Sequence, residues 1–426
     1  MNFELTVQKL VYGGEALGHH EGRAVLAPRV LPGERAEVEA VRTAKGVVHA
    51  RPVRILETSP ERVEPPCPYF GRCGGCQYQH LRPDLQPIVK REILRETLRR
   101  IGKITWDSEI ALHTASPWNY RNQAQLKVAR QANGQIALGF FEAESHRLYP
   151  VDACLILSSR LNAVLGELSR PAWASRLGEC REIELWADDR DERVMVSLRG
   201  GLGQGDAEAT ARDMLAQIPG VVSVAAESGG RSLVFGESGL EYAVGDFRYR
   251  VSPGSFFQAS RYLLPDLLEA VTAGRSGRLA LDLFAGVGLF SLPLARQFAQ
   301  VISVEAAAQS AADLAANAKA HSLGNVRAVG ETAFDFLRRF AQAEPDLVVL
   351  DPPRSGVETR AVKFLTDCRP KQIHYVSCSP PTLARDLSFL FQRGYRIISI
   401  EMFDLFPQTY HIESLVRLTR SDLAGP

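Results

Sequence analysis

From residue 276 onward, short apolar runs alternate with segments of helical periodicity, which is typical of an α/β sheet. We expect parallel strands at 279–284, 301–305, 326–329, 347–351, 373–378 and 396–401. A last apolar run, 412–418, follows too closely for a crossover helix, so its strand should run antiparallel to its predecessor, at the edge of the sheet. The pattern predicts a doubly wound, seven-stranded sheet that binds its ligand at the carboxyl ends of its strands.

The first 57 residues alternate apolar and polar positions, with glycines between the runs. Short strands at this spacing predict a five-stranded β-barrel of the kind that binds oligonucleotides. A small barrel that only packs against its neighbour and binds nothing would have the same pattern, so both interpretations stay open.

Residues 58–275 have a mixed pattern. Apolar residues recur at helical spacing across 88–102, and arginines occupy the opposite face. From residue 111 the pattern is β-rich, with helical stretches at 160–168 and 207–216. We therefore expect three domains: a barrel (1–57), a β-rich α+β central domain (58–275) and an α/β domain (276–426).

Composition narrows the class of protein. Hydrophobic residues make up 45% and charged residues 23% of the 426 residues, values that exclude a disordered chain, a fibrous repeat or a coiled coil. No apolar run approaches membrane-spanning length and the start lacks a signal-peptide pattern, so we expect a cytoplasmic protein without membrane contact. We also expect a monomer. The net charge of +1 hides a local excess, because residues 51–130 hold fourteen Arg or Lys and eight Asp or Glu. Such an excess favours binding to a phosphate backbone.

Three segments of the α/β region suggest a nucleoside-type ligand. LDLFAGVGLF places Gly286 and Gly288 on the turn after the first strand, where the backbone can approach a ligand closely. Glu305 ends the second strand, where an acidic residue accepts hydrogen bonds from ribose hydroxyls. Asp351 ends the fourth strand and precedes two prolines, which predicts a rigid loop with a carboxylate directed into the cleft. Because the turn lacks the third glycine of a dinucleotide fingerprint, these segments favour S-adenosylmethionine over NAD.

The cysteines indicate two different kinds of chemistry. Cys378 ends the fifth strand just before a helix, whose N-terminus should lower the pKa of the thiol; a small buried hydrophobic residue is the alternative interpretation. Cys67, Cys73 and Cys76 form a C-x5-C-x2-C motif on a glycine-rich loop, which suits zinc or an iron–sulfur cluster. From the residues alone, the candidates for a fourth ligand are Cys154, Cys180 and Cys368.

VSCSPPTLARD, around Cys378, is similar to the nucleophile motif of the RNA 5-methyluridine methyltransferases. The usual motif has Asn after the Cys and Ala after the first Pro, where this chain has Ser379 and Pro381. Further matches follow in the family's order over essentially the whole chain: YRNQAQL, SFFQ, LDLFAGVGLF, LDPPR and FPQTYHIES. The resemblance implies an S-adenosylmethionine-dependent RNA (uracil-C5)-methyltransferase whose N-terminal barrel is of the TRAM type.

The resemblance also implies roles for single residues. Cys378 would add to C6 of uracil, because C5 becomes nucleophilic enough to accept a methyl group only after such an addition. Glu413, in HIES, would then remove the C5 proton. Leu289 stands where some relatives carry a polar residue, so we assign it no contact. The residues that map onto contacts with S-adenosylmethionine are Gln258, Phe284, Glu305 and Asp351.

Family members that carry an iron–sulfur cluster have a similar cysteine spacing and take a fourth cysteine from a D-x-C segment, which matches VDAC in this chain. The resemblance therefore implies, in preference to zinc, one [4Fe-4S] cluster held by Cys67, Cys73, Cys76 and Cys154. Cys180 and Cys368 are then ordinary core residues.

The expected substrate is RNA. Relatives that have both the barrel and the cluster often act on 23S ribosomal RNA, which we expect here. One alternative is the same reaction on a T-loop uridine of tRNA. Another is a non-catalytic RNA-binding or chaperone protein on the same fold, although the presence of both Cys378 and Glu413 argues against it.

Overall fold

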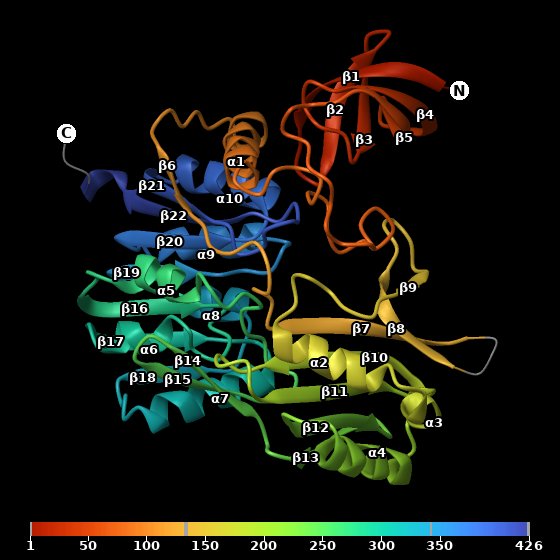
Figure 1. Ribbon diagram of the computed structural model, residues 1–426. Helices are drawn as coiled ribbons and strands as arrows, with labels where there is room; N and C mark the ends of the chain where they lie inside the picture. The colour runs from red at the N-terminus through yellow and green to blue at the C-terminus, as the bar shows by residue number, and fades with distance from the viewer. Residues whose placement is uncertain (1, 132–134, 341–342, 424–426) are drawn as a thin grey trace.

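The computed structural model describes residues 2–131, 135–340 and 343–423. Figure 1 shows three parts: a small barrel at the N-terminus, a sheet with helices on both faces, and a second β-rich part made from the middle of the chain. Among the helices described, none is both long and apolar enough to cross a lipid bilayer.

Five strands close into the N-terminal barrel in the order β1-β2-β3-β5-β4. They are β1 (Asn2–Leu10), β2 (Glu15–His20), β3 (Arg23–Pro28), β4 (Arg35–Ala44) and β5 (Val47–Glu57). Alternate residues of β1, such as Leu5 and Val7, are buried inside the barrel, as expected for a strand with one face in a core. The predicted five-stranded barrel is confirmed.

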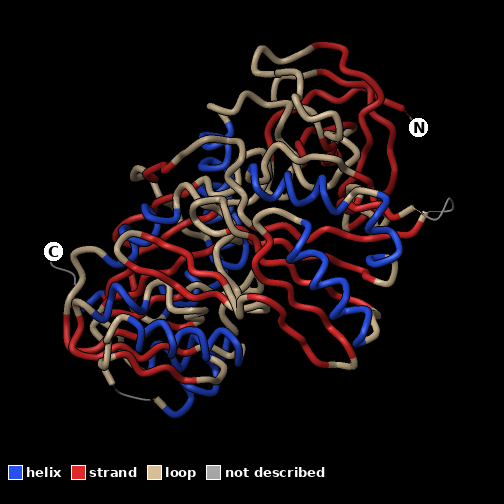
Figure 2. Tube along the Cα trace, turned by 60° about the horizontal axis from the view of Figure 1, so that its bottom comes forward, coloured by secondary structure: helices blue, strands red, loops and turns tan. Residues whose placement is uncertain are grey.

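The central part contains a seven-stranded sheet in the order β13-β12-β11-β10-β7-β8-β9. Its strands are β7 (Gln123–Arg130), β8 (Ile136–Phe141), β9 (Leu148–Pro150), β10 (Cys180–Ala187), β11 (Val194–Gly200), β12 (Val221–Ser228) and β13 (Arg231–Gly236). Its helices are α2 (Ser159–Leu168), η1 (Pro171–Trp173), α3 (Ala174–Leu177) and α4 (Gln204–Gln217). Figure 2 shows helices of this part lying along its strands. The two predicted helical stretches correspond to α2 and α4.

A hairpin and a helix connect the central sheet to the α/β sheet. The hairpin consists of β14 (Leu240–Val244) and β15 (Phe247–Val251), and the helix is α5 (Leu264–Thr272). The hairpin packs against α7 (Ala308–Ala320) of the α/β part, where the side chain of Asn317 bonds both the N–H and the C=O of Arg250. The segment between hairpin and helix, which includes SFFQ, is therefore fixed beside the α/β sheet.

The α/β part is an eight-stranded sheet in the order β18-β17-β16-β19-β20-β22-β21-β6. Seven of its strands lie where the sequence predicts them: β16 (Gly277–Leu283), β17 (Phe298–Val304), β18 (Val326–Val329), β19 (Leu347–Leu350), β20 (Gln372–Ser377), β21 (Tyr395–Phe403) and β22 (Glu413–Arg420). Besides α7, its helices are α6 (Ser291–Ala295), α8 (Ala333–Arg339), α9 (Thr359–Asp367), α10 (Pro380–Gln392) and the terminal η2 (Ser421–Leu423).

The last strand, β22, runs antiparallel to β21 as predicted, but it does not lie at the edge of the sheet. It is inserted between β20 and β21 and pairs with both in antiparallel fashion. The physical reason is burial: six of the eight residues of β22 are buried, on both of its faces, whereas exposed residues alternate along much of β21. A strand covered on both faces is favoured inside a sheet rather than at its edge.

An eighth strand, β6 (Ile110–His113), extends the α/β sheet beyond the predicted seven. It pairs in parallel with β21, although it precedes the whole α/β region in the sequence. Helix α1 (Gln86–Gly102) likewise packs against α10, through an apolar face that includes Leu94 and Leu98. Ile101, which shares the predicted periodicity, is 50% exposed near the end of the helix. Helix α1 and strand β6, which precede residue 114 in the sequence, thus complete the α/β part.

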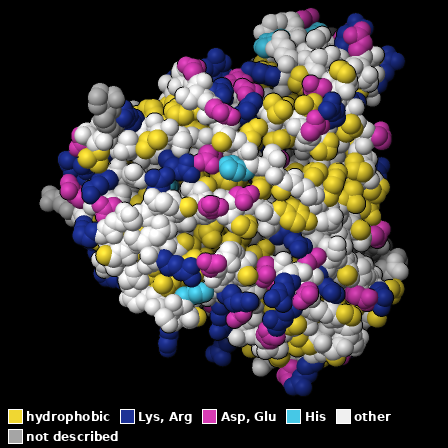
Figure 3. Space-filling view, turned by 60° about the vertical axis from the view of Figure 1, so that its left-hand side comes forward, with side chains coloured by type: hydrophobic (Ala, Val, Ile, Leu, Met, Phe, Trp, Pro, Cys, Tyr) yellow, Lys and Arg dark blue, Asp and Glu magenta, His cyan; other side chains and the backbone are white. Residues whose placement is uncertain are grey.

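The basic excess of residues 51–130 does not form a bare positive surface. Arg51 pairs with Glu39 of the barrel, and Lys90 is fully buried against Asp404. On the face drawn in Figure 3, Lys and Arg side chains are likewise interspersed with Asp and Glu. Sequence clustering of charge therefore overstates the density of unpaired cations.

Candidate active site

A cavity of about 780 Å³ lies where β16, β17, β19 and β20 end and β22 begins. Because β22 is antiparallel, its first residue lies at the same edge of the sheet as the last residues of the parallel strands. The cavity brings together all six residues expected to catalyse the reaction or contact its cofactor: Gln258, Phe284, Glu305, Asp351, Cys378 and Glu413. Leu289, to which we assigned no contact, also lines the cavity.

Glu305 holds the glycine-rich turn that follows β16. One carboxylate oxygen accepts a hydrogen bond from the N–H of Gly286 at 2.8 Å, and the other accepts one from the N–H of Ala307 at 2.7 Å. Gly286 has φ = 53° and Gly288 has φ = 97°, values in the left-handed region that favours glycine. Phe284 has φ = 67°, an uncommon value for a residue with a side chain, and such strain concentrates at ligand sites. The turn therefore presents open backbone beside an oriented carboxylate.

Asp351 faces the cavity from the end of β19, where Gln258 donates a hydrogen bond to its carboxyl group at 3.1 Å. Burial and the neighbouring Asp282 raise the pKa of Asp351 to about 7, against the opposing effect of the Gln258 bond. Asp282 lies fully buried on β16, accepts a hydrogen bond from Ser291 at 2.5 Å, and has its own pKa raised by burial to about 7. These two carboxyl groups thus titrate near neutral pH.

Cys378 has a higher pKa than we predicted. Its thiol is half-buried just before α10, yet burial, Glu413 and Asp351 together raise its pKa to about 12, against the opposing effects of Arg354 and a backbone hydrogen bond. The prediction that the helix N-terminus lowers this pKa is wrong, because desolvation and two nearby carboxyl groups outweigh the helix dipole. The thiol is therefore protonated at neutral pH and requires a proton acceptor before it can attack.

Glu413 is 3% exposed at the start of β22, with burial and Asp351 raising the pKa of its carboxyl group well above the usual range. In the β20–β22 pair, Ser377 is opposite Ser414. Continuing this register by one residue places Cys378 opposite Glu413. Within the described chain, the Oε1 atom of Glu413 has no hydrogen-bond partner, so it is free to bind a ligand.

The barrel also reaches this site. Tyr12, in the loop after β1, donates a hydrogen bond to the carbonyl of Cys378 at 3.5 Å. Its ring meets the ring of Tyr410 edge-on, with 5.5 Å between centroids. The barrel is thus in direct contact with the loops that carry the catalytic candidates.

Cys67, Cys73, Cys76 and Cys154 line a second cavity of about 320 Å³. Burial is the main cause that raises the pKa of Cys76 to about 12 and that of Cys154 to about 11, and the neighbouring thiols add to it. Cys180 and Cys368 are instead buried in apolar cores. Across residues 2–131, 135–340 and 343–423, no three His, Cys, Asp or Glu side chains are arranged to bind a single metal ion.

A family model described as tRNA (uracil-5-)-methyltransferase matches residues 89–421. The chain belongs to this methyltransferase family. The match covers the α/β sheet, its cavity and the central sheet, and it begins within α1, after the barrel and the first three cysteines.

Relatives matched over nearly their whole length are named RNA methyltransferases. An uncharacterized RNA methyltransferase of Halalkalibacterium halodurans is 32% identical over 97% of this chain and 96% of its own length. The 23S rRNA (uracil(1939)-C(5))-methyltransferase RlmD of Pectobacterium atrosepticum is 34% identical over 97% of this chain and 93% of its own. The crystal structure of Pyrococcus abyssi tRNA (uracil-54, C5)-methyltransferase, in complex with S-adenosyl-L-homocysteine, has a TM-score of 0.77 and 24% identity over 98% of this chain and 100% of that one. That structure has the same fold.

The methyltransferase cavity contains residues to which sequence reasoning gave no role. Phe256 is 62% exposed on its wall, and Arg121 and His411 line both this cavity and the cysteine-lined one. Arg354 donates to His411 at 3.3 Å, and burial together with this cation lowers the pKa of the imidazole to about 3. The sequence did give a signal for these residues, because each lies in a motif that resembles the family. A motif alone, however, does not say which of its side chains face the ligand. The motifs are YRNQAQL, SFFQ, LDPPR and FPQTYHIES.

Proposed function

We propose that this protein transfers a methyl group from S-adenosylmethionine to C5 of a uridine in RNA. The observation that carries the proposal is the facing arrangement of Cys378 and Glu413 at one end of the cavity whose other walls hold the predicted cofactor residues. A thiol alone or a carboxyl group alone is common in buried sites. A thiol opposite a carboxyl group beside a nucleoside-type site is what methylation of C5 through a C6 adduct requires.

The residues around the glycine-rich turn fit S-adenosylmethionine. Gly286 lines the cavity and leaves its backbone open to a nucleoside, and the carboxylate of Glu305 is oriented to accept hydrogen bonds from ribose hydroxyls. Phe284, Gln258 and Asp351 form the neighbouring walls. When bound, the cofactor supplies a methyl group on a positively charged sulfur, which is the electrophile of the reaction.

The chain's own residues would carry the covalent steps. The Cys378 thiol loses its proton, and its sulfur bonds to C6 of uracil while the C5–C6 double bond shifts to form an enolate. C5 would then form a bond to the methyl carbon while the bond from that carbon to the cofactor's sulfur breaks, and the sulfur would leave with the electron pair as a neutral thioether. Glu413 takes the C5 proton, the C5–C6 double bond re-forms, and the carbon–sulfur bond to Cys378 breaks. Of the two carboxyl groups that raise the pKa of the thiol, Asp351 would accept the thiol proton, which leaves Glu413 unprotonated to take the C5 proton.

We also propose that Cys67, Cys73, Cys76 and Cys154 hold one [4Fe-4S] cluster. Four thiols around one cavity are the donor set that such clusters use. The described residues contain no group arranged to bind a single metal ion, so the proposal rests on the four thiols that line one cavity. The cluster's proposed role is to fix the cysteine loop, and no step of the methyl transfer passes through it.

For the RNA, we propose 23S ribosomal RNA. A full-length relative at 34% identity is named a 23S rRNA methyltransferase, which supports this choice. A T-loop uridine of tRNA is the second candidate, because the structural neighbour from Pyrococcus abyssi acts on uracil 54 of tRNA. Phe256, exposed on the cavity wall, is suited to stack on the target base, and the barrel is the proposed RNA-binding module. One chain supplies every residue proposed for the site, so we propose that the monomer is active. We also propose that it acts in the cytoplasm.

A methylation assay tests the proposal. Purified protein is incubated with radiolabelled S-adenosylmethionine and either 23S rRNA fragments or tRNA transcripts, and nucleosides are then separated by mass. We expect 5-methyluridine in the ribosomal fragments. Label in tRNA alone would move the proposal to the second candidate, and label on another base would refute it.

A further inference from the structure

We propose that Gln86 is a positioning residue for the reaction, acting through Gln408 on the orientation of Glu413. This inference rests on the proposed function, because it concerns the step in which Glu413 removes the C5 proton. The segment concerned is 404–412, which connects β21 to β22 and is called the base loop below.

Gln86 and Gln408 form a closed pair of hydrogen bonds. The Gln86 side-chain N–H donates to the side-chain oxygen of Gln408 at 2.9 Å, and the backbone N–H of Gln408 donates to the side-chain oxygen of Gln86 at 2.8 Å. Both side chains have no solvent exposure. Gln408 also has φ = 68°, a left-handed conformation that is unfavourable for a residue with a side chain. Such a conformation persists only where its surroundings hold it in place.

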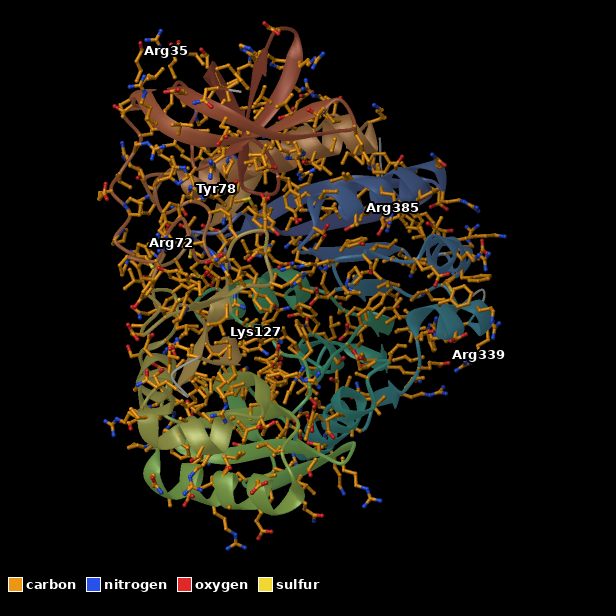
Figure 4. The ribbon with its side chains drawn as sticks, turned by 90° about the vertical axis from the view of Figure 1, so that its right-hand side faces the viewer. Arg35, Arg72, Tyr78, Lys127, Arg339 and Arg385 are labelled. Carbon is orange, nitrogen blue, oxygen red and sulfur yellow. The ribbon has the colours of Figure 1, made fainter. Side chains whose placement is uncertain are left out.

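Other anchors of the base loop also come from outside the α/β region. The carbonyl of Gln408 accepts hydrogen bonds from the N–H groups of Gln77 and Tyr78, both at 2.9 Å. Gln77 comes directly after Cys76, and Tyr78 lies beneath the barrel in Figure 4. Tyr120 donates to the carbonyl of Pro407 at 3.0 Å.

The base loop is also held by an ion pair whose lysine comes from helix α1, outside the α/β region of the sequence. On α1, one helical turn after Gln86, the fully buried Lys90 donates to the carboxylate of Asp404 at 2.7 Å and to the carbonyl of Phe406 at 2.9 Å. The loop is thus held along its length by residues between 77 and 120.

Strand pairing with Phe403 of β21 fixes the backbone of Glu413, so the base loop acts on the orientation of its side chain. Glu413 is the first residue of β22 and follows the base loop directly, and its Oε1 atom has no hydrogen-bond partner in the described chain. Its side chain is therefore oriented by its backbone and by packing. Phe406 and His411 of the same loop also line the cavity. A shift of the loop would thus change the packing around the side chain of the proposed base, whereas Cys378 lies on a different loop, between β20 and α10.

A variant with Gln86→Met separates this role from a merely structural one. Methionine has a similar volume but makes none of the side-chain hydrogen bonds of Gln86, which join it to Gln408 and also to the carbonyls of Tyr78 and Leu81. Gln408→Asn, described below, leaves the two carbonyl bonds intact. If the side chain of Glu413 is displaced, the thiol still adds and the methyl group still transfers, but removal of the C5 proton slows. We expect kcat to fall about 10-fold to 100-fold, the KM for S-adenosylmethionine to change less than about 2-fold, and a methylated protein–RNA adduct to accumulate on a denaturing gel.

Three further variants complete the experiment. Thr97→Val, on the same helix, removes a hydrogen bond to Ile93 that does not touch the base loop, and it should behave like the wild type. Gln408→Asn keeps an amide and tolerates the left-handed conformation, so it should fold and show a smaller accumulation of adduct. Because Gln86 acts through Gln408, combining Gln86→Met with Gln408→Asn should add little to Gln86→Met alone.

Several results would overturn the inference. One is a Gln86→Met protein that keeps the thermal midpoint of the wild type and turns over at the wild-type rate. Another is a loss of activity without adduct, since this would place the defect before methyl transfer. If Gln86→Met does not fold, normal turnover by Gln408→Asn refutes the inference equally. Failure of the wild type to methylate uridine would instead refute the proposed function on which it rests.

Discussion

Cys378 and Glu413 occupy facing positions at the ends of β20 and β22, one step beyond the Ser377–Ser414 pair. Hydrogen bonds between the two strands therefore set the backbone spacing of the proposed nucleophile and the proposed base. This arrangement is possible because β22 is inserted beside β20 rather than added at the edge of the sheet. The strand order of the fold thus brings the two reactive groups together.

Substitution of these two residues should stop the reaction at different stages. Cys378→Ala removes the atom that makes C5 nucleophilic, so neither methyl transfer nor an adduct should form. Glu413→Gln leaves the thiol able to add and C5 able to accept the methyl group, but removes a base worth about 10²–10⁴ in rate. A denaturing gel with uridine-containing RNA and cofactor should show a slowly migrating band for Glu413→Gln and none for Cys378→Ala. Normal turnover by Glu413→Gln would identify another group as the base.

Asp282→Asn should change how stability depends on pH. Burial raises the pKa of Asp282 from 3.8 to about 7, so between these values the folded protein binds a proton that the unfolded chain has released. Stability is then lost as the pH rises from about 4 to 7. Asparagine stays neutral and still accepts the bond from Ser291, so relative to the wild type the variant should gain up to roughly 4 kcal/mol by pH 8. Urea unfolding of cofactor-free protein at pH 5 and pH 8 measures the free energy of unfolding of both proteins. The same difference between variant and wild type at the two pH values would contradict the prediction.

The cysteine cavity should bind iron and sulfide. Protein purified without oxygen should be brown and contain both elements, because its four thiols complete a cluster-binding shell. Cys154→Ser should lose most of the visible absorbance. Cys180→Ser is the matched control, since Cys180 is buried in the apolar core of the central sheet, and it should retain the colour. Stoichiometric zinc without sulfide would show that the cluster assignment is wrong.

Glu305→Gln should weaken cofactor binding without affecting RNA binding. The carboxylate accepts from Gly286 and Ala307 through different oxygens, and an amide offers only one oxygen for the two donors. Loss of a charged acceptor at this turn should raise the Kd for S-adenosylmethionine about 10-fold or more, as measured by calorimetry. Glu331→Gln is a suitable control, because Glu331 also lines the cavity but pairs with Arg339. Equal effects of both substitutions would argue against a specific role for Glu305.

The sequence predicts much of the fold, because hydrophobic periodicity reports burial directly. The seven strands of the α/β sheet lie within a few residues of their predicted positions. The position of β22 inside the sheet was missed, although its nearly continuous burial is visible in the apolar run of the sequence. Strand β6 has only four residues, and nothing in so short a run indicates a partner such as β21.

Predictions for the site succeed where they depend on position and fail where they depend on environment. Cys378 and Asp351 are at the cavity because each ends a strand, which periodicity reveals. The pKa of Cys378 was predicted in the wrong direction, because it depends first on burial of the thiol and then on Glu413, and both arise only after the chain folds. The buried contacts of Gln408 were also invisible in the sequence, because their partners come from residues 77–86.

The pairing of β6 with β21 has a consequence for synthesis of the protein. When β6 has been translated, nearly three quarters of the chain is still to be made, and β21, the one strand with which β6 pairs among the described residues, emerges close to the last residue. Through most of translation, α1 also lacks α10, so its apolar face is exposed for a chaperone to bind. A message truncated before codon 395 would yield a chain with an open sheet edge, which is prone to aggregation and is a target for proteases.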